Sequence, residues 1–194
     1  QNRLYNSYFP VRSNNVLNNI SLPSADAPEF RVDGTPQVEG LIPMGSALTV
    51  TGSGPIYYTV DGVDPRVDGG AISPSAILVN SGDTIPLSAG ALLKARVRSG
   101  ANWSALATGT FYVGPIANSA NLVVSEFMYN PLGSEEGTEF IELLNIDAVI
   151  AIDLSSLSFS GIDYTFSLGQ SLAAGERLVL VKDFTAFAAA YNTA

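Results

Sequence analysis

Apolar and polar residues alternate along most of this chain in short runs, which is the period of a β-strand. Residues 92–98 show it most clearly, because Leu93, Ala95 and Val97 share one face of such a strand. The opposite face carries a row of bases, which we interpret as a solvent-facing surface and not as a binding stripe: Lys94, Arg96 and Arg98. Similar runs, separated by Gly, Pro, Asp and Ser, recur along the chain and predict β-sandwiches.

The runs divide the chain into an arm, two β modules and a linker. Residues 1–35 are polar and Asn-rich and read as an N-terminal arm. Residues 36–115 form the first predicted sandwich and residues 121–194 the second. Between them, 116–120 (IANSA) is a linker so short that we expect the two modules to contact each other.

Two segments have apolar spacings typical of a helix. Val16, Leu17 and Ile20 lie three and four residues apart after Ser13, which suits an N-cap. The run at 184–191 (FTAFAAAY) predicts a short terminal helix. The fold class expected is therefore all-β, with a short helical arm before the first sandwich.

Composition narrows the chemistry. The chain has no cysteine and no histidine, which excludes thiol catalysis, Ser-His-Asp triads, disulfides and His- or Cys-ligated metal sites. No apolar run approaches the roughly 20 residues of a membrane span. The chain begins at Gln1 without a signal-peptide pattern, which predicts either a removed signal or an internal part of a longer protein.

Charge is uneven along the chain. Residues 121–194 hold ten acidic and two basic residues, a net charge of −8 out of −9 for the whole chain. Nucleic-acid binding depends on neutralising phosphates with Lys and Arg, so this distribution argues against nucleic acid as a partner. It leaves Ca²⁺ or a basic partner open.

The motifs IYYTVDGVDPR (56–66) and LLKARVRSGANWSALATGTFYV (92–113) resemble the chitobiase/β-hexosaminidase C-terminal-type domain. That resemblance covers about 75 residues of this chain and places Trp103 where the family has a tryptophan. It implies an immunoglobulin-like sandwich of the kind appended to other domains.

The motifs LVVSEFMYNP (122–131), TEFIELLN (138–145), DLSSLSFS (153–160) and LAAGERLVLVKD (172–183) resemble the lamin-tail domain, another immunoglobulin-like fold. Leu157 stands where that family commonly has a tryptophan. The family continues with further strands after this last motif, so the resemblance predicts a second sandwich that is incomplete at its C-terminal end.

Residues 8–30 (YFPVRSNNVLNNISLPSADAPEF) resemble the segment after the kinase-like domain in bacterial exported proteins of the spore-coat CotH type. Those proteins often carry the other two modules in this order. The resemblance implies an extracellular or cell-surface bacterial location and a catalytic domain upstream. Residues 1–194 themselves contain no kinase phosphate loop or metal motif, so we expect no enzymatic activity from them.

Asp61, Asp64 and Asp68 are spaced by three and four residues on a Gly-rich loop. Oxygen-rich loops can hold Ca²⁺, which takes six to eight oxygen ligands. Three carboxylates supply too few without backbone carbonyls and water, and the spacing is not that of an EF-hand. The alternative, which we favour, is that these aspartates form turns.

Glu126, Glu139 and Glu142 could include the carboxylate pair of a glycoside hydrolase. A small sandwich offers no deep cleft, so we favour hydrogen bonds to backbone or to nearby Ser and Asn instead. Trp103, with Tyr57, Tyr58 and Tyr112, is a candidate platform for stacking a sugar, against the alternative that these rings are core or edge cover.

The function expected is that of a non-catalytic accessory region, which spaces or anchors an upstream domain at the cell surface. The alternative is a carbohydrate- or Ca²⁺-assisted adhesion module, with a protein or a cell-surface glycan as partner. The predicted incomplete sandwich adds one expectation, because an unpaired strand edge recruits other strands. Residues 121–194 are expected to self-associate through such an edge or to be the less stable half.

Overall fold

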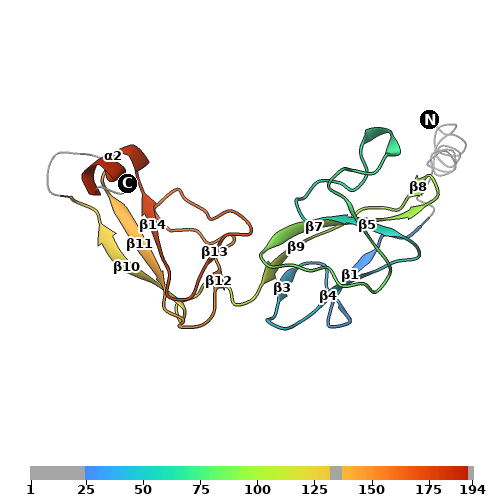
Figure 1. The fold of residues 1–194 in the computed structure, drawn as a ribbon, viewed down its shortest axis with the longest axis horizontal. Coiled ribbons are helices and arrows are strands. Elements are labelled where there is room, and N and C mark those ends of the chain that lie inside the picture. Colours follow the sequence, from blue (N-terminus) through green and yellow to red (C-terminus); the bar gives the residue numbers. More distant parts are fainter. Residues whose placement is uncertain (1–24, 132–136, 192–194) are drawn as a thin grey trace, which may run out of the picture.

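The structure of this chain is a computed structural model that describes residues 25–131 and 137–191. Two β modules lie end to end along the long axis of the molecule (Figure 1). The first module comprises residues 29–113 and the second comprises the described residues of 122–191. The expected all-β fold with sandwich-like modules is confirmed, and its sheets are compatible with an immunoglobulin-like arrangement.

The first module has a small sheet and a large one. The small sheet has the order β2-β1-β4, from β1 (Glu29–Val32), β2 (Thr35–Pro36) and β4 (Leu48–Thr51). The large sheet has the order β3-β9-β7-β5-β6, from β3 (Gly40–Ile42), β5 (Ile56–Thr59), β6 (Ile77–Val79), β7 (Ala91–Ser99) and β9 (Ala107–Val113), with β8 (Asn102–Trp103) also paired to β7. Only β3 and β9 run parallel among these pairs.

The core of the first module consists of thirteen buried residues, twelve from the two sheets and Ile85 from the segment between β6 and β7. The predicted alternation in β7 is confirmed, because Ala91, Leu93, Ala95 and Val97 are all buried. Phe111 is fully buried, and its ring meets that of Phe30 edge-on with 5.4 Å between centroids. Inward-facing residues of the small and large sheets thus close one continuous core.

Two expectations for this half need correction. Phe30 and Val32 of β1 belong to the core, so the first module takes in residues that the sequence analysis placed in the arm. The basic face of β7 is not simply solvated, because the side chain of Arg96 is 16% exposed and pairs with Asp64. A loop from residues 61–76, folded over this face, is the physical reason.

The second module has fewer strands and a smaller core. Its main sheet has the order β10-β11-β14, from β10 (Leu122–Met128), β11 (Phe140–Asn145) and β14 (Arg177–Val181). A two-stranded ladder, β12 (Ile152–Asp153) with β13 (Ser171–Leu172), accompanies it. Six buried residues form the core: Ile141, Leu143, Ile152, Leu154, Phe166 and Leu172.

Helix α2 (Phe184–Tyr191) confirms the predicted terminal helix. The carboxylate of Asp183 accepts the backbone N–H groups of Thr185 and Ala186, which caps the helix start. The rings of Phe187 and Tyr191 then pack on Phe140 of β11. The helix predicted near residues 13–20 lies outside the described residues, and no helix among those described is both long and apolar enough to cross a membrane.

Candidate functional site

The three aspartates proposed as calcium ligands are placed on the loop that covers the large sheet. Asp61 accepts the N–H of Val63 through Oδ1 at 2.9 Å, and this hydrogen bond lowers the pKa of its carboxyl group. Asp68 begins a short 3-10 turn, Asp68–Gly70. Among the described residues, no three acidic side chains gather around a point where a metal ion could bind. Calcium binding by this loop stays a prediction.

Asp64 is the least available of these carboxylates. Its two oxygens accept Nε and Nη2 of Arg96 at 2.8 and 2.7 Å, and Oδ1 also accepts the N–H of Arg66. The hydrogen bonds from Arg96 are the main cause of a lowered pKa at Asp64. A bidentate pair between these planar groups fixes the loop to the sheet at a defined place. Its role in this structure is therefore structural.

Trp103 lies next to this pair and is also enclosed, with 8% of the residue exposed. Its Nε1 donates to the carbonyl of Gly70 at 2.8 Å, which ties the covering loop from a second point. The ring of Tyr57 meets it edge-on, and the guanidinium of Arg98 lies 5.3 Å from its centroid. Stacking of a sugar needs an open ring face, and in this structure Trp103 has none.

The glutamates considered as a hydrolase pair lie on the surface of the second module. Glu142 accepts Ser125 Oγ at 2.7 Å and Arg177 Nε at 2.9 Å through Oε1. Glu139 pairs with Lys182 at 2.7 Å. Glu126 lies directly across the ladder from Glu142. Only the bond from Ser125 to Glu142 is of the favoured kind, a hydrogen bond to a nearby serine. The contacts to Arg177 and Lys182 are ion pairs, and Glu126 has no partner among the described residues.

The junction between the modules is organised by Asp153, which is 5% exposed. Its Oδ2 accepts the N–H of Val113, at the end of the first module, at 3.3 Å. Its backbone N–H donates to Pro115 and its carbonyl accepts from Ala117, both at 2.9 Å. The linker therefore pairs with β12 of the second module, and one side chain reaches across to the first.

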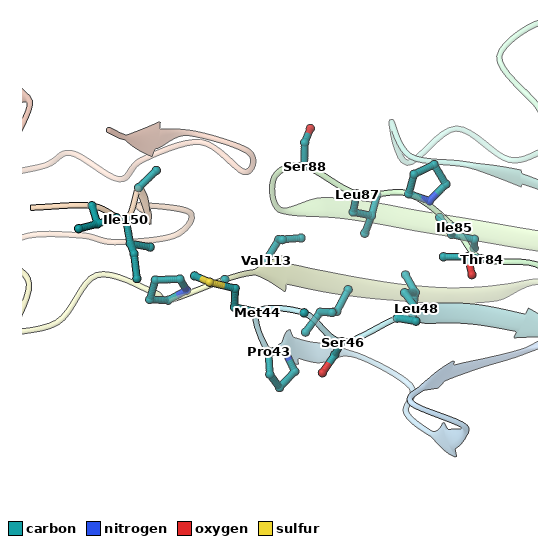
Figure 2. Close-up of a pocket in the computed structure, with 18 residues that line it drawn as sticks. Pro43, Met44, Ser46, Leu48, Thr84, Ile85, Leu87, Ser88, Val113 and Ile150 are labelled. Atoms are coloured by element: carbon teal, nitrogen blue, oxygen red, sulfur yellow. The ribbon is translucent and has the colours of Figure 1, made fainter. Parts of the chain in front are cut away.

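A crevice of about 660 Å³ opens beside this junction. Figure 2 shows Pro43, Met44 and Val113 of the first module on one side and Ile150 of the second on the other. Met44 is 60% exposed and reaches toward the second module. The lining includes no charged side chain, so the crevice offers apolar contact and little to orient a polar ligand.

A second hollow, of about 430 Å³, lies in the second module where β10 ends, β11 begins and β14 ends. We call it the aromatic pocket and define it by Phe127, Tyr129, Phe140, Ile162 and Tyr164 with the polar residues Glu139, Asp163 and Lys182. Phe127 and Tyr129 are 59% and 72% exposed, and their rings stack at 5.9 Å. This is the most exposed group of aromatic rings among the described residues.

Comparison with protein-family models, with curated proteins and with solved structures found no match to this chain. The resemblances noted in the sequence therefore stay predictions.

Two features of the site were missed by sequence reasoning. Asp153 was read only as part of a family motif, and no local pattern signals that it crosses to Val113. The aromatic pocket brings together residues more than thirty positions apart. Its one local signal was FMY at 127–129, three consecutive apolar residues that cannot all face inward on a strand.

Proposed function

We propose that this chain is a non-catalytic accessory region of an exported bacterial protein, and that it holds an attached domain at a set distance and orientation from the cell surface. The observation that carries the proposal is the Asp153 junction. A spacer transmits orientation only when its modules are fixed to each other. Here the buried carboxylate of Asp153, in β12, accepts from the end of β9, and the backbone of Asp153 bonds to the linker.

Close packing supports the same conclusion. A Cβ atom at Gly90 of the first module would lie 2.7 Å from Ser155 Oγ and 3.1 Å from Asp153 Oδ2. Glycine at this position lets the two modules approach to contact distance. The linker itself is held by Asn118 and Asn121, whose amide groups both donate to the carbonyl of Ile116. It is therefore a braced connection and not a flexible coil.

The test is whether both modules share one alignment in solution. Residual dipolar couplings measured on the described part of each module should fit a single alignment tensor for the parent chain. In Asp153→Ala, the couplings should still fit each module alone but require two different tensors. Asp163→Asn, a change at an exposed acid away from the junction, is the control and should keep one tensor. Two independent tensors in the parent chain would remove the basis of the spacer proposal.

A further inference from the structure

We propose that the aromatic pocket of the second module binds an arginine or lysine side chain from an extended basic segment of a partner protein. This goes beyond the spacer role, because it gives the chain a recognition site of its own. The site joins exposed ring faces to one acidic group, Asp163, that has no basic partner among the described residues. Three observations carry it.

The first observation is that Phe127, in the wall of the pocket, lies on the face of the sheet that packs into the core. Phe127 is paired with Ile141 across the β10–β11 ladder, and Ile141 with Leu180 across the next. The three side chains therefore share the face that forms the core. Ile141 is 8% exposed, yet Phe127 is 59% exposed, because no described segment covers this end of the face. Apolar rings left open in this way mark interaction surfaces.

The second observation is that the bases of this module are already engaged. Lys182 pairs with Glu139, and Arg177 pairs with Glu142. Asp163 and Glu126, in contrast, make no hydrogen bond or ion pair with the described residues. Since residues 121–194 carry a net charge of −8, the field at the pocket attracts cations and repels anions.

The third observation is that a carboxylate and rings line the same hollow. Asp163 lies between Ile162 and Tyr164 in the chain, and all three line the same pocket as Phe127 and Tyr129. A long basic side chain suits both parts. Its methylene stem packs along aromatic faces, its cation interacts with the rings, and its charged end bonds to a carboxylate.

The rings and the negative charge of the pocket also favour one kind of ligand over the others. A second copy of this chain carries the same negative charge in its second module, which opposes self-docking at this pocket. A neutral sugar could stack on Tyr129 but would leave the charge of Asp163 unbalanced. A basic segment satisfies the rings and the charge together, so it is the occupant to which we commit.

The experiment uses the whole chain and a short fluorescent peptide in which arginine alternates with leucine. Binding is followed by fluorescence polarisation, and the contact surface by shifts in the ¹H–¹⁵N spectrum. We expect saturable binding that weakens at high salt, with shifted amides around 127–129 and 162–164. Asp163→Asn and Tyr129→Ala should each raise the dissociation constant by about fivefold to tenfold.

Matched controls separate the site from general attraction to an acidic protein. Asp68→Asn removes the same charge at an exposed position of the first module, and Val149→Ala removes an exposed apolar group; neither should change binding. Peptides with citrulline or glutamate in place of arginine should bind less tightly than the arginine peptide. The proposal is overturned if those peptides bind equally well, if Asp163→Asn has no more effect than Asp68→Asn, or if shifts fall outside the pocket. Shifts at the pocket with neutral oligosaccharides but not with the arginine peptide would also overturn it.

Discussion

At the residue scale, two candidate site residues of the first module, Asp64 and Trp103, hold a loop in place on the large sheet. Asp64 and Arg96 hydrogen-bond to each other, and Trp103 donates to Gly70 of the same loop. Arg96 also donates to the carbonyl of Ser104 at 2.7 Å. Such partly buried networks define a conformation, because losing one member leaves the others unsatisfied.

We therefore expect Asp64→Asn to lower the free energy of unfolding of the first module by about 1–3 kcal/mol at neutral pH. Arg96 holds the pKa of Asp64 below its ordinary value, so the stability from this pair is complete above the unfolded-state pKa of about 3.9. It is lost as pH falls through the lower folded-state pKa. The difference between parent and variant should shrink in that acidic range.

Urea unfolding followed by the fluorescence of Trp103 measures this effect, since Trp103 is the single tryptophan and lies buried in the first module. Asp68→Asn, which removes an exposed carboxylate from the same loop, should change the free energy of unfolding by no more than about 0.5 kcal/mol. Equal effects from both variants at neutral pH, or a difference that does not vary with pH, would contradict the role given to the Asp64–Arg96 pair.

At the element scale, the parallel contact between β3 and β9 depends on one close approach. Gly40, Leu41 and Ile42 pair with 111–113, and the chain just before them passes over Gly109. A Cβ atom on Gly109 would lie 2.0 Å from the carbonyl oxygen of Val38. Since that neighbour is backbone, it cannot rotate away, and β3 would have to shift along its whole length.

Gly109→Ala should therefore destabilise the first module by about 1–3 kcal/mol, through overpacking and loss of the β3–β9 pairing. The same fluorescence-detected urea unfolding gives the value. Gly54→Ala is the matched control, because its nearest contact would be an ordinary 3.5 Å from Val97. If both substitutions have the same small effect, the close approach at Gly109 is not what positions β3.

At the scale of the whole molecule, the two modules differ in how much core they contain. Thirteen buried residues form the core of the first module and six that of the second. In the second, β10 and β14 are edge strands of a three-stranded sheet. In β14, the backbone groups of Leu178 and Leu180 form the hydrogen bonds to β11. The N–H and C=O groups of Arg177, Val179 and Val181 therefore point outward, away from β11.

Native-state hydrogen exchange should accordingly show the second module opening at a lower free energy than the first. We expect the slowest amides in β5, β7 and β9, and faster exchange in β11 and β14, because local stability follows buried apolar contact. Light scattering during size-exclusion chromatography tests the related expectation, that an exposed strand edge promotes self-association at high concentration. A strict monomer with equally protected strands in both modules would contradict these expectations.

The sequence by itself was enough for the local features. Period-two alternation predicted β7, a compact apolar run predicted α2, and regular turn residues predicted two all-β modules. These succeed because each depends on which face a residue takes relative to its near neighbours, and that follows from backbone geometry alone.

Tertiary structure decided what those residues meet. Arg96 has the position of a solvent-facing base in its strand, but a loop thirty residues away covers it with Asp64. Phe127 has the position of a core residue, yet stays exposed because no described segment covers it. Asp153 lies at the junction because Pro115 and the linker residue Ala117 hydrogen-bond to its backbone. Contacts of this kind depend on where distant segments pass in space, which no local period encodes.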